Sequence, residues 1–209
     1  MTKLPRPRVP LPDLFPATEV KTVDEGQLVW RVYRAGGRHP TTWNAFRTFG
    51  PVMTARFDHH EPPPHDDPGR EILYGAFDIA GALIEAFQDS RVIDRARREP
   101  WLVGFELAFD LIALNLRGAW PTRAGASQAI SSGRRDVARE WSRAIYAAYP
   151  SIQALLYPSA MAGGSVNLAL YERAAHVVPI RPRFHAPLTH PGLLDPIARI
   201  AARDGYGMR

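Results

Sequence analysis

The segment EILYGAFDIAGALIEAF, residues 71–87, contains a strand pattern that leads directly into a helix pattern. Its first part is rich in β-branched and aromatic residues, which is typical of a strand over 71–77. Asp78 can accept a hydrogen bond from the free N–H groups of a first helical turn. Apolar residues then recur at spacings of three and four, which predicts a helix that extends to about residue 89.

The rest of the chain adds further strands and one more helix. Runs of β-branched and aromatic residues predict extended segments at 28–34, 51–57, 101–116, 152–157, 165–171 and 176–180. Asp136 can cap a helix over 137–148, whose apolar residues share one face. Strands interrupted irregularly by helices favour an α+β domain with a mixed sheet. No GxGxxG or P-loop motif is present, which argues against Rossmann and P-loop domains.

Three segments are expected to lie outside this core. Residues 1–27 carry several prolines and predict an extended arm, and 117–135 is loop-like. Residues 58–70 predict a polar, mobile loop that borders a cleft. His59 and His60 in this loop are adjacent rather than at helical i, i+4 spacing, so we expect no metal site.

The composition predicts one globular domain with a basic surface. The chain has 209 residues, is 45% hydrophobic and carries a net charge of +5 with only two lysines, so almost all its cations are arginines. Guanidinium groups suit a phosphorylated ligand, an acidic partner or nucleic acid, although a GC-rich genome would produce the same bias. The absence of cysteine excludes disulfides, thiolate metal sites and a cysteine nucleophile. Prolines break the N-terminal stretch and no long apolar run occurs, which predicts a cytoplasmic protein without a membrane segment.

Two arginines occur within or beside predicted strands. Arg31 lies in the first strand, and Arg56 follows a Gly-Pro turn. A half-buried guanidinium needs an anionic partner because an unpaired buried charge is costly. That partner is either an Asp or Glu of this chain or a ligand such as a pyrophosphate, which forked hydrogen bonds would hold. Arg34 and Arg38 are expected to be solvated.

Four further residues are candidates for a site. Tyr74 and Glu85 are eleven residues apart, so the strand end and the third helical turn can face one cleft. A core tyrosine and a solvated carboxylate remain the alternatives. Ser159 in YPSA and Asn167 in VNLALY offer a hydroxyl and an amide. Ser159 lacks a GxSxG elbow and assignable partners, so it is not expected to be a nucleophile, and a turn serine is the alternative.

The chain resembles the bacterial RES-domain family over about residues 28–175 through an ordered set of residues: Arg31, Arg56, Tyr74, Glu85, Ser159 and Asn167. RES domains are similar in fold to ADP-ribosyltransferases, with the nucleotide lying across the cleft of a split sheet. The resemblance thus implies a single RES-like domain over 28–209, preceded by the arm at 1–27. Its expected architecture is a mixed, split β-sheet flanked by helices.

The resemblance also implies a function. RES proteins act as toxins of toxin–antitoxin pairs, degrading NAD until an antitoxin with an Xre-like region neutralises them. Carried over, Arg31 and Arg56 hold the pyrophosphate. Glu85 acts at the nicotinamide ribose, and Tyr74 stacks on a ring. Ser159 and Asn167 bind ribose or phosphate oxygens. NAD is therefore expected as the substrate, and no cofactor or metal is implied.

Several alternatives remain open at this point. The ADP-ribosyl acceptor is water, inorganic phosphate as a co-substrate, or a protein side chain, which correspond to a glycohydrolase, a phosphorylase and a protein ADP-ribosyltransferase. A different class is a non-enzymatic, arginine-rich module whose binding of nucleic acid or an acidic protein would weaken steeply with salt. No helix-turn-helix or RNA-binding motif is present, so nucleic acid is expected only through the antitoxin. A homo-oligomer is also left open.

Overall fold

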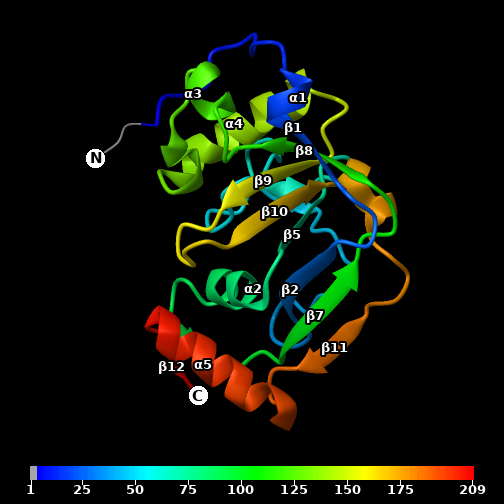
Figure 1. Ribbon diagram of the computed structural model, residues 1–209, viewed down its shortest axis with the longest axis vertical. Helices are drawn as coiled ribbons and strands as arrows, with labels where there is room; N and C mark the ends of the chain where they lie inside the picture. Colours follow the sequence, from blue (N-terminus) through cyan, green and yellow to red (C-terminus); the bar gives the residue numbers. More distant parts are fainter. Residues whose placement is uncertain (1–3) are drawn as a thin grey trace.

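The computed structural model describes residues 4–209, and an eight-stranded sheet runs through its centre (Figure 1). In spatial order the strands are β1 (Val20–Val23), β8 (Leu111–Asn115), β9 (Ala154–Pro158), β10 (Val166–Tyr171), β5 (Ile72–Ala76), β2 (Leu28–Arg34), β7 (Pro100–Glu106) and β11 (Phe184–Pro187). Strands β8 and β9 are parallel, and the other neighbouring pairs are antiparallel. The mixed sheet confirms the predicted α+β class.

Helices flank this sheet. They are α1 (Pro16–Glu19), α2 (Ile79–Ala86), α3 (Trp120–Arg123), α4 (Arg135–Ala148), α5 (Leu194–Asp204) and the 3-10 helices η1 (Gln128–Ser131), η2 (Glu172–Val177) and η3 (Pro191–Leu193). Two short ribbons pair β3 (Phe49–Gly50) with β4 (His65–Asp66) and β6 (Val92–Ile93) with β12 (Gly207–Met208). Helix α4 packs on the β9–β10 half, and α2 and α5 cover the β7–β11 half (Figure 1). Within residues 4–209, no helix is long and apolar enough to cross a membrane.

The sheet is nearly divided between β5 and β2. Strand β2 pairs with β7 along its whole length, but it pairs with β5 only where Trp30 lies opposite Ala76. Gly75 lies beside this contact, where an added Cβ would be 2.7 Å from Cγ1 of Val29. A side chain at Gly75 would therefore force the two strands apart. This division confirms the split sheet that the family resemblance implies.

The strand–helix unit at 71–87 folds as predicted. Strand β5 leads into α2, and the Asp78 carboxylate at the N-cap accepts a hydrogen bond from the backbone N–H of Gly81 (2.7 Å). The strands predicted at 28–34, 152–157 and 165–171 are confirmed as β2, β9 and β10.

Two predicted strands are wrong. Residues 51–57 contain no strand, because the Val52 N–H donates to Oδ2 of Asp58 (2.6 Å) and not to a neighbouring strand. Residues 176–180 span the end of η2, and the strand comes later as β11. The apolar character of this segment reflects the burial of Val177 in the core rather than strand pairing.

Two other segments differ in detail from the prediction. The extended segment at 101–116 forms two strands, β7 and β8, and the loop-like region at 117–135 contains α3 and η1, anchored by the fully buried Trp120. The prediction that Asp136 caps a helix is wrong, because α4 begins at Arg135 and its N-cap is Arg134. Asp136 lies in the first turn, where it pairs with Arg134 and interacts favourably with the helix dipole.

The predicted N-terminal arm is partly incorporated into the fold. Strand β1 pairs with β8 at the edge of the sheet, and the buried Glu19 forms an ion pair with Arg123. The expectation that this segment lies outside the core is therefore wrong for β1, which is part of the sheet, and α1 is helical rather than extended, while residues 1–3 lie outside the described part of the chain.

The predicted polar loop begins inside the core. Asp58, His59 and His60 are fully buried, and the exposed part of the segment begins at Glu61. The Asp58 carboxylate accepts hydrogen bonds from Nη2 of Arg47 (2.9 Å) and from the His60 ring. The prediction of a mobile loop is therefore wrong for its first three residues. Within residues 4–209, no group of three or more His, Asp or Glu side chains could hold a metal ion.

His59 is packed between two tyrosine rings. Its ring centroid lies 4.4 Å from that of Tyr146 and 4.5 Å from that of Tyr171, and its Nε2 lies 3.2 Å from Oε2 of Glu172. Burial lowers the pKa of His59, although Glu172 partly opposes this effect. The folded protein therefore favours the neutral imidazole.

This burial predicts that acid destabilises the fold. The unfolded chain binds a proton at His59 more readily than the folded chain does, so the free energy of unfolding should fall as the pH drops through about 6.5. Burial also lowers the pKa of the His185 imidazole, which adds a loss in the same direction. Urea unfolding at pH 7.5 and 5.5 measures the change.

A matched pair of variants isolates the contribution of His59. The pH-dependent loss should be smaller in His59→Phe, whereas His39→Gln, at an exposed histidine, should retain the wild-type loss. An equal loss in wild type and His59→Phe would contradict the assignment.

Candidate functional site

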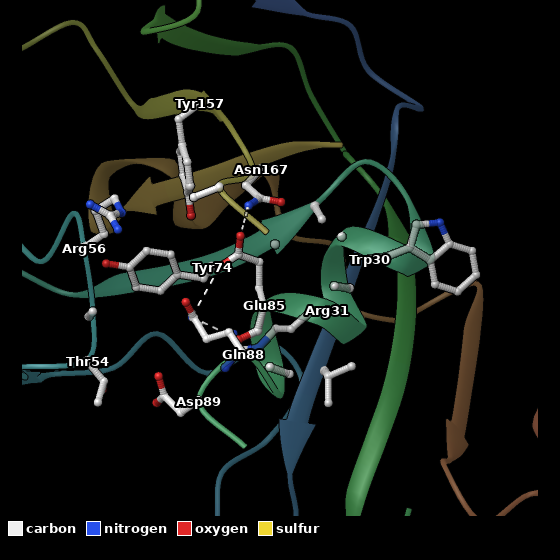
Figure 2. Close-up of a pocket in the computed structure, with 18 of the residues that line it drawn as sticks. Trp30, Arg31, Thr54, Arg56, Tyr74, Glu85, Gln88, Asp89, Tyr157 and Asn167 are labelled. Carbon is white, nitrogen blue, oxygen red and sulfur yellow. Dashed lines mark hydrogen bonds between the residues drawn. The ribbon is translucent and has the colours of Figure 1, made fainter. Parts of the chain in front are cut away.

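A cavity of about 510 Å³ opens at the divided part of the sheet, between β5 and β2 (Figure 2). Helix α2, residues of β9 and β10 and the segment 52–56 complete its wall. Its volume is within the range of sites for small organic ligands. Five residues chosen from the sequence line it: Arg31, Arg56, Tyr74, Glu85 and Asn167. The sixth, Ser159, donates a hydrogen bond to Glu85.

Close packing of α2 positions Glu85 in the cavity. An added Cβ at Gly81 would lie 3.1 Å from the Cβ atoms of both Ala76 and Ser165, so glycine permits the helix to approach β5 and β10. The hydroxyl of Ser165 also donates to Asp78, the helix N-cap (3.0 Å). The start of α2 is therefore fixed against β10, which carries Asn167.

Three side chains orient the Glu85 carboxylate. Its Oε1 accepts hydrogen bonds from Oγ of Ser159 (2.7 Å) and Nδ2 of Asn167 (2.8 Å). Its Oε2 accepts one from Nε2 of Gln88 (3.3 Å), and Figure 2 shows Glu85 between Asn167 and Gln88. Because donors from the end of β9, from β10 and from the turn after α2 converge on it, the carboxylate has a defined direction in the cavity.

The Ser159 hydroxyl is fully engaged with the protein. It donates to Glu85 and accepts hydrogen bonds from the backbone N–H groups of Met161 (3.1 Å) and Ala162 (2.9 Å). This arrangement positions Glu85 and leaves Ser159 outside the lining of the cavity. Direct contact between Ser159 and a ligand remains a prediction.

Gln88 and Arg135 extend the support behind Glu85. Nη2 of Arg135 donates to Oε1 of Gln88 (2.8 Å), and this orients the amide so that its Nε2 faces Glu85. Both residues line the cavity. No local pattern predicts their roles, because the contact joins the turn after α2 to the start of α4, which are about fifty residues apart in the sequence.

Arg31 and Arg56 have no acidic partner. Arg31 donates to the carbonyl of Ala45 (3.2 Å), and Arg56 donates to that of Gly133 (2.6 Å). Neither guanidinium lies within 4.0 Å of a carboxylate in residues 4–209, so the alternative of an internal ion pair is wrong for both. Burial lowers the pKa of Arg31 to about 10, and burial together with nearby Arg135 lowers the pKa of Arg56. Both remain cationic at neutral pH.

Arg34 differs from its predicted exposure. It is half-buried and lines the cavity, with its guanidinium 4.9 Å from the centroid of the Phe87 ring. It donates weakly to the carbonyl of Ala86 (3.4 Å). The expectation that Arg34 is solvated is therefore wrong, because the C-terminal end of α2 and the Phe87 ring pack against its guanidinium.

Two tyrosines supply aromatic surface. Tyr74 and Tyr157 both line the cavity, and the Tyr157 ring centroid lies 4.6 Å from that of Phe57. Burial raises the pKa of both phenols, so both hydroxyls stay protonated at neutral pH. Sequence analysis did not single out Tyr157, although strand alternation places it on the same face of β9 as Leu155.

The buried carboxylate of Asp58 anchors part of the cavity wall. Asp58 binds Arg47 and the Val52 N–H, and both of these residues line the cavity. Burial tends to raise the pKa of Asp58, but hydrogen bonds from His60 and the charge of Arg47 outweigh it, so the pKa is lowered. The segment that carries Arg56 is therefore anchored from inside the core.

The cavity thus combines unpaired guanidinium groups, the oriented carboxylate of Glu85 and two tyrosine rings. Guanidinium groups without carboxylate partners favour an anionic ligand, and phosphate oxygens match their forked geometry. The tyrosine rings offer stacking surfaces for a flat heterocycle. The oriented carboxylate can stabilise a positive charge that develops on the ligand.

Comparison with solved structures supports this architecture. A chain of the M. tuberculosis MbcT–MbcA toxin–antitoxin complex superposes with a TM-score of 0.54 at 16% sequence identity. The match covers 83% of this chain and 90% of that chain, so the two share a fold. A sequence comparison with curated proteins gave no match.

Comparison with family models identifies the domain. The model described as RES domain matches residues 28–190, which is most of the chain and includes all six residues of the ordered set. The matched region contains β2, β5, α2 and β10, the elements that build the cavity. The chain therefore belongs to the RES domain family.

Proposed function

We propose that this protein is a toxin that cleaves the bond between nicotinamide and ribose in NAD. The observation that carries the proposal is the oriented carboxylate of Glu85 in a cavity whose Arg31 and Arg56 lack acidic partners. NAD fits both features of this cavity. Its anionic pyrophosphate suits the two arginines, and cleavage of its glycosidic bond develops positive charge on the ribose, which suits the carboxylate.

The reaction divides into binding and bond cleavage. Arg31 and Arg56 hold the pyrophosphate through charge-assisted hydrogen bonds, which fix the nicotinamide ribose near Glu85. The C–N bond breaks and its electron pair leaves with neutral nicotinamide, so C1′ acquires oxocarbenium character. The Glu85 carboxylate stabilises this charge and binds the ribose hydroxyls, while Tyr74 stacks on a ring. An acceptor then bonds to C1′ and releases its proton.

The acceptor is water or inorganic phosphate in this proposal. Water gives ADP-ribose, and phosphate gives ADP-ribose with a phosphate on C1′. Transfer to a protein would instead make the chain an ADP-ribosyltransferase. A non-enzymatic arginine-rich module would need none of this chemistry, and its binding would be insensitive to Glu85.

An antitoxin is the proposed partner. The solved neighbour comes from a toxin–antitoxin complex, which supports a proteinaceous inhibitor for this chain. We propose an antitoxin with an Xre-like region that contacts DNA, so that this protein reaches nucleic acid only through it. A cytoplasmic location follows, since NAD and such an antitoxin are both found there.

Turnover of NAD should depend on the Glu85 carboxylate. Purified wild type should release nicotinamide from NAD, and Glu85→Gln should lower kcat roughly 10²–10³-fold, because removing one preorganised charge-stabilising group has an effect of this size. Glu25→Gln, at an exposed carboxylate outside the cavity, should retain the wild-type rate. Chromatography of nicotinamide measures the release.

The same assay tests the proposal and its alternatives. Running it with and without inorganic phosphate, and identifying the second product, separates phosphorolysis from hydrolysis. Labelled protein in a lysate would indicate a transferase. If folded wild type at high concentration left NAD intact, the NAD-degrading function would be abandoned.

Gln88 and Arg31 should affect different kinetic constants. Gln88→Ala should lower kcat by about 10²-fold with little change in KM, because a misdirected Glu85 carboxylate still permits NAD to bind. Arg31→Gln should chiefly raise KM, by about tenfold or more, because a charge-assisted hydrogen bond to the pyrophosphate is lost. Steady-state kinetics on folded variants measures both constants.

The reverse pattern would contradict these roles. A rise in KM alone for Gln88→Ala would mean that Gln88 contacts the substrate rather than orienting Glu85. A pure kcat effect for Arg31→Gln would remove it from ground-state binding.

A further inference from the structure

A second cavity of about 230 Å³ adjoins the first. The two share four lining residues: Arg34, Ala86, Asp89 and Arg98. The candidate site is therefore one continuous cleft that extends past the end of α2 to Val92 of β6 and to Arg209, which follows β12. Three arginines without an assigned role line this extension: Arg34, Arg97 and Arg98.

Two turns that are hydrogen-bonded to each other place Arg98 next to the segment that follows Arg34. The N–H of Ala35 donates to the carbonyl of Glu99 (3.0 Å), and the N–H of Gly36 donates to that of Arg98 (3.2 Å). Arg98 and Glu99 have φ values of 65° and 49°, which are uncommon for residues with side chains. Gly37 permits this contact, because an added Cβ would lie 3.1 Å from Cγ of Arg98. The fold thus maintains a strained backbone that places Arg98 beside Arg34.

The acidic residues of this cavity are already engaged. Asp94 pairs with Arg209 (2.8 Å) and accepts hydrogen bonds from the backbone N–H groups of Ala96 (3.1 Å) and Arg97 (2.8 Å). The Asp89 carboxylate lies 3.7 Å from Nη2 of Arg135. Both acids are therefore neutralised by arginines other than the three in question.

Arg34, Arg97 and Arg98 have no carboxylate within 4.0 Å in residues 4–209. Burial lowers the pKa of Arg34, and the neighbouring charges of Arg98 and Arg97 lower it further, against a partial offset by Asp94. Like charges held close together without an acid are relieved by a bound anion. A phosphate group, with two negative charges and three terminal oxygens, is the complement that fits three guanidinium groups.

We propose that the second cavity is a subsite for a dianionic phosphate group, distinct from the pyrophosphate contacts of Arg31 and Arg56. This inference rests on the proposed function, because it takes the adjoining cleft to hold NAD. Two sources offer the same chemistry. One is a further phosphate on the substrate, such as the 2′-phosphate of NADP, and the other is free inorganic phosphate.

The test uses the full chain and the variants Arg97→Gln and Arg98→Gln, with Arg117→Gln as a control of equal charge change at an exposed arginine outside both cavities. Calorimetry measures the affinities for NADP, NAD and inorganic phosphate at constant ionic strength. Because binding is read without turnover, the result does not depend on cleavage of NAD. Circular dichroism verifies the fold of each variant.

If the subsite exists, Arg97→Gln and Arg98→Gln should each lose about tenfold or more in one of two quantities: the NADP-to-NAD affinity ratio or the affinity for inorganic phosphate. If the substrate supplies the phosphate, the NADP-to-NAD affinity ratio falls in both variants and is unchanged in Arg117→Gln. If the phosphate is free, affinity for inorganic phosphate falls and the ratio stays constant. If both variants bound each of the three ligands with the same affinity as wild type does, the subsite would be overturned. Variant-dependent phosphate binding by a protein that leaves NAD intact would keep the subsite and refute the proposed function.

Discussion

The single backbone contact between β2 and β5, at Trp30 and Ala76, is the constraint on which the site depends. Had these strands paired along their length, as β2 and β7 do, their side chains would have packed against each other and closed the space. Because they diverge, Arg31 from one strand and Tyr74 from the other face a common cavity. The division is stabilised from both sides, by α4 on one half of the sheet and by α2 with α5 on the other.

The cavity contains groups that lower the stability of the folded protein. Half-buried arginines without acidic partners reduce the stability of the fold, and the strained backbone at Arg98 reduces it further. The surrounding structure offsets the cost through rigid anchors such as the buried Asp58–Arg47 pair and the capped start of α2. An anionic ligand would pair with these guanidinium groups and offset the cost of their unpaired charge, which is consistent with a binding site rather than a structural ion-pair network.

Local patterns predicted those parts of the fold whose causes are local. The strand–cap–helix order around Asp78 was readable because alternation, capping and helical spacing all act within a few residues. The strand predicted at 51–57 failed because Asp58, a residue with a buried long-range role, captures the Val52 N–H. The Gln88–Arg135 hydrogen bond and the partial burial of Arg34 against Phe87 likewise depend on contacts between residues far apart in the sequence, so no local spacing predicts them. Five of the six residues in the ordered set line the cavity, whereas the contact of the sixth, Ser159, with Glu85 became visible only in three dimensions.

The most direct test of the account is a crystal structure of the Glu85→Gln variant with NAD bound. The account predicts NAD across the divided sheet, with its pyrophosphate against Arg31 and Arg56 and its nicotinamide ribose within hydrogen-bonding distance of position 85. NAD bound elsewhere on the protein, or an empty cavity at saturating NAD with the fold unchanged, would contradict it.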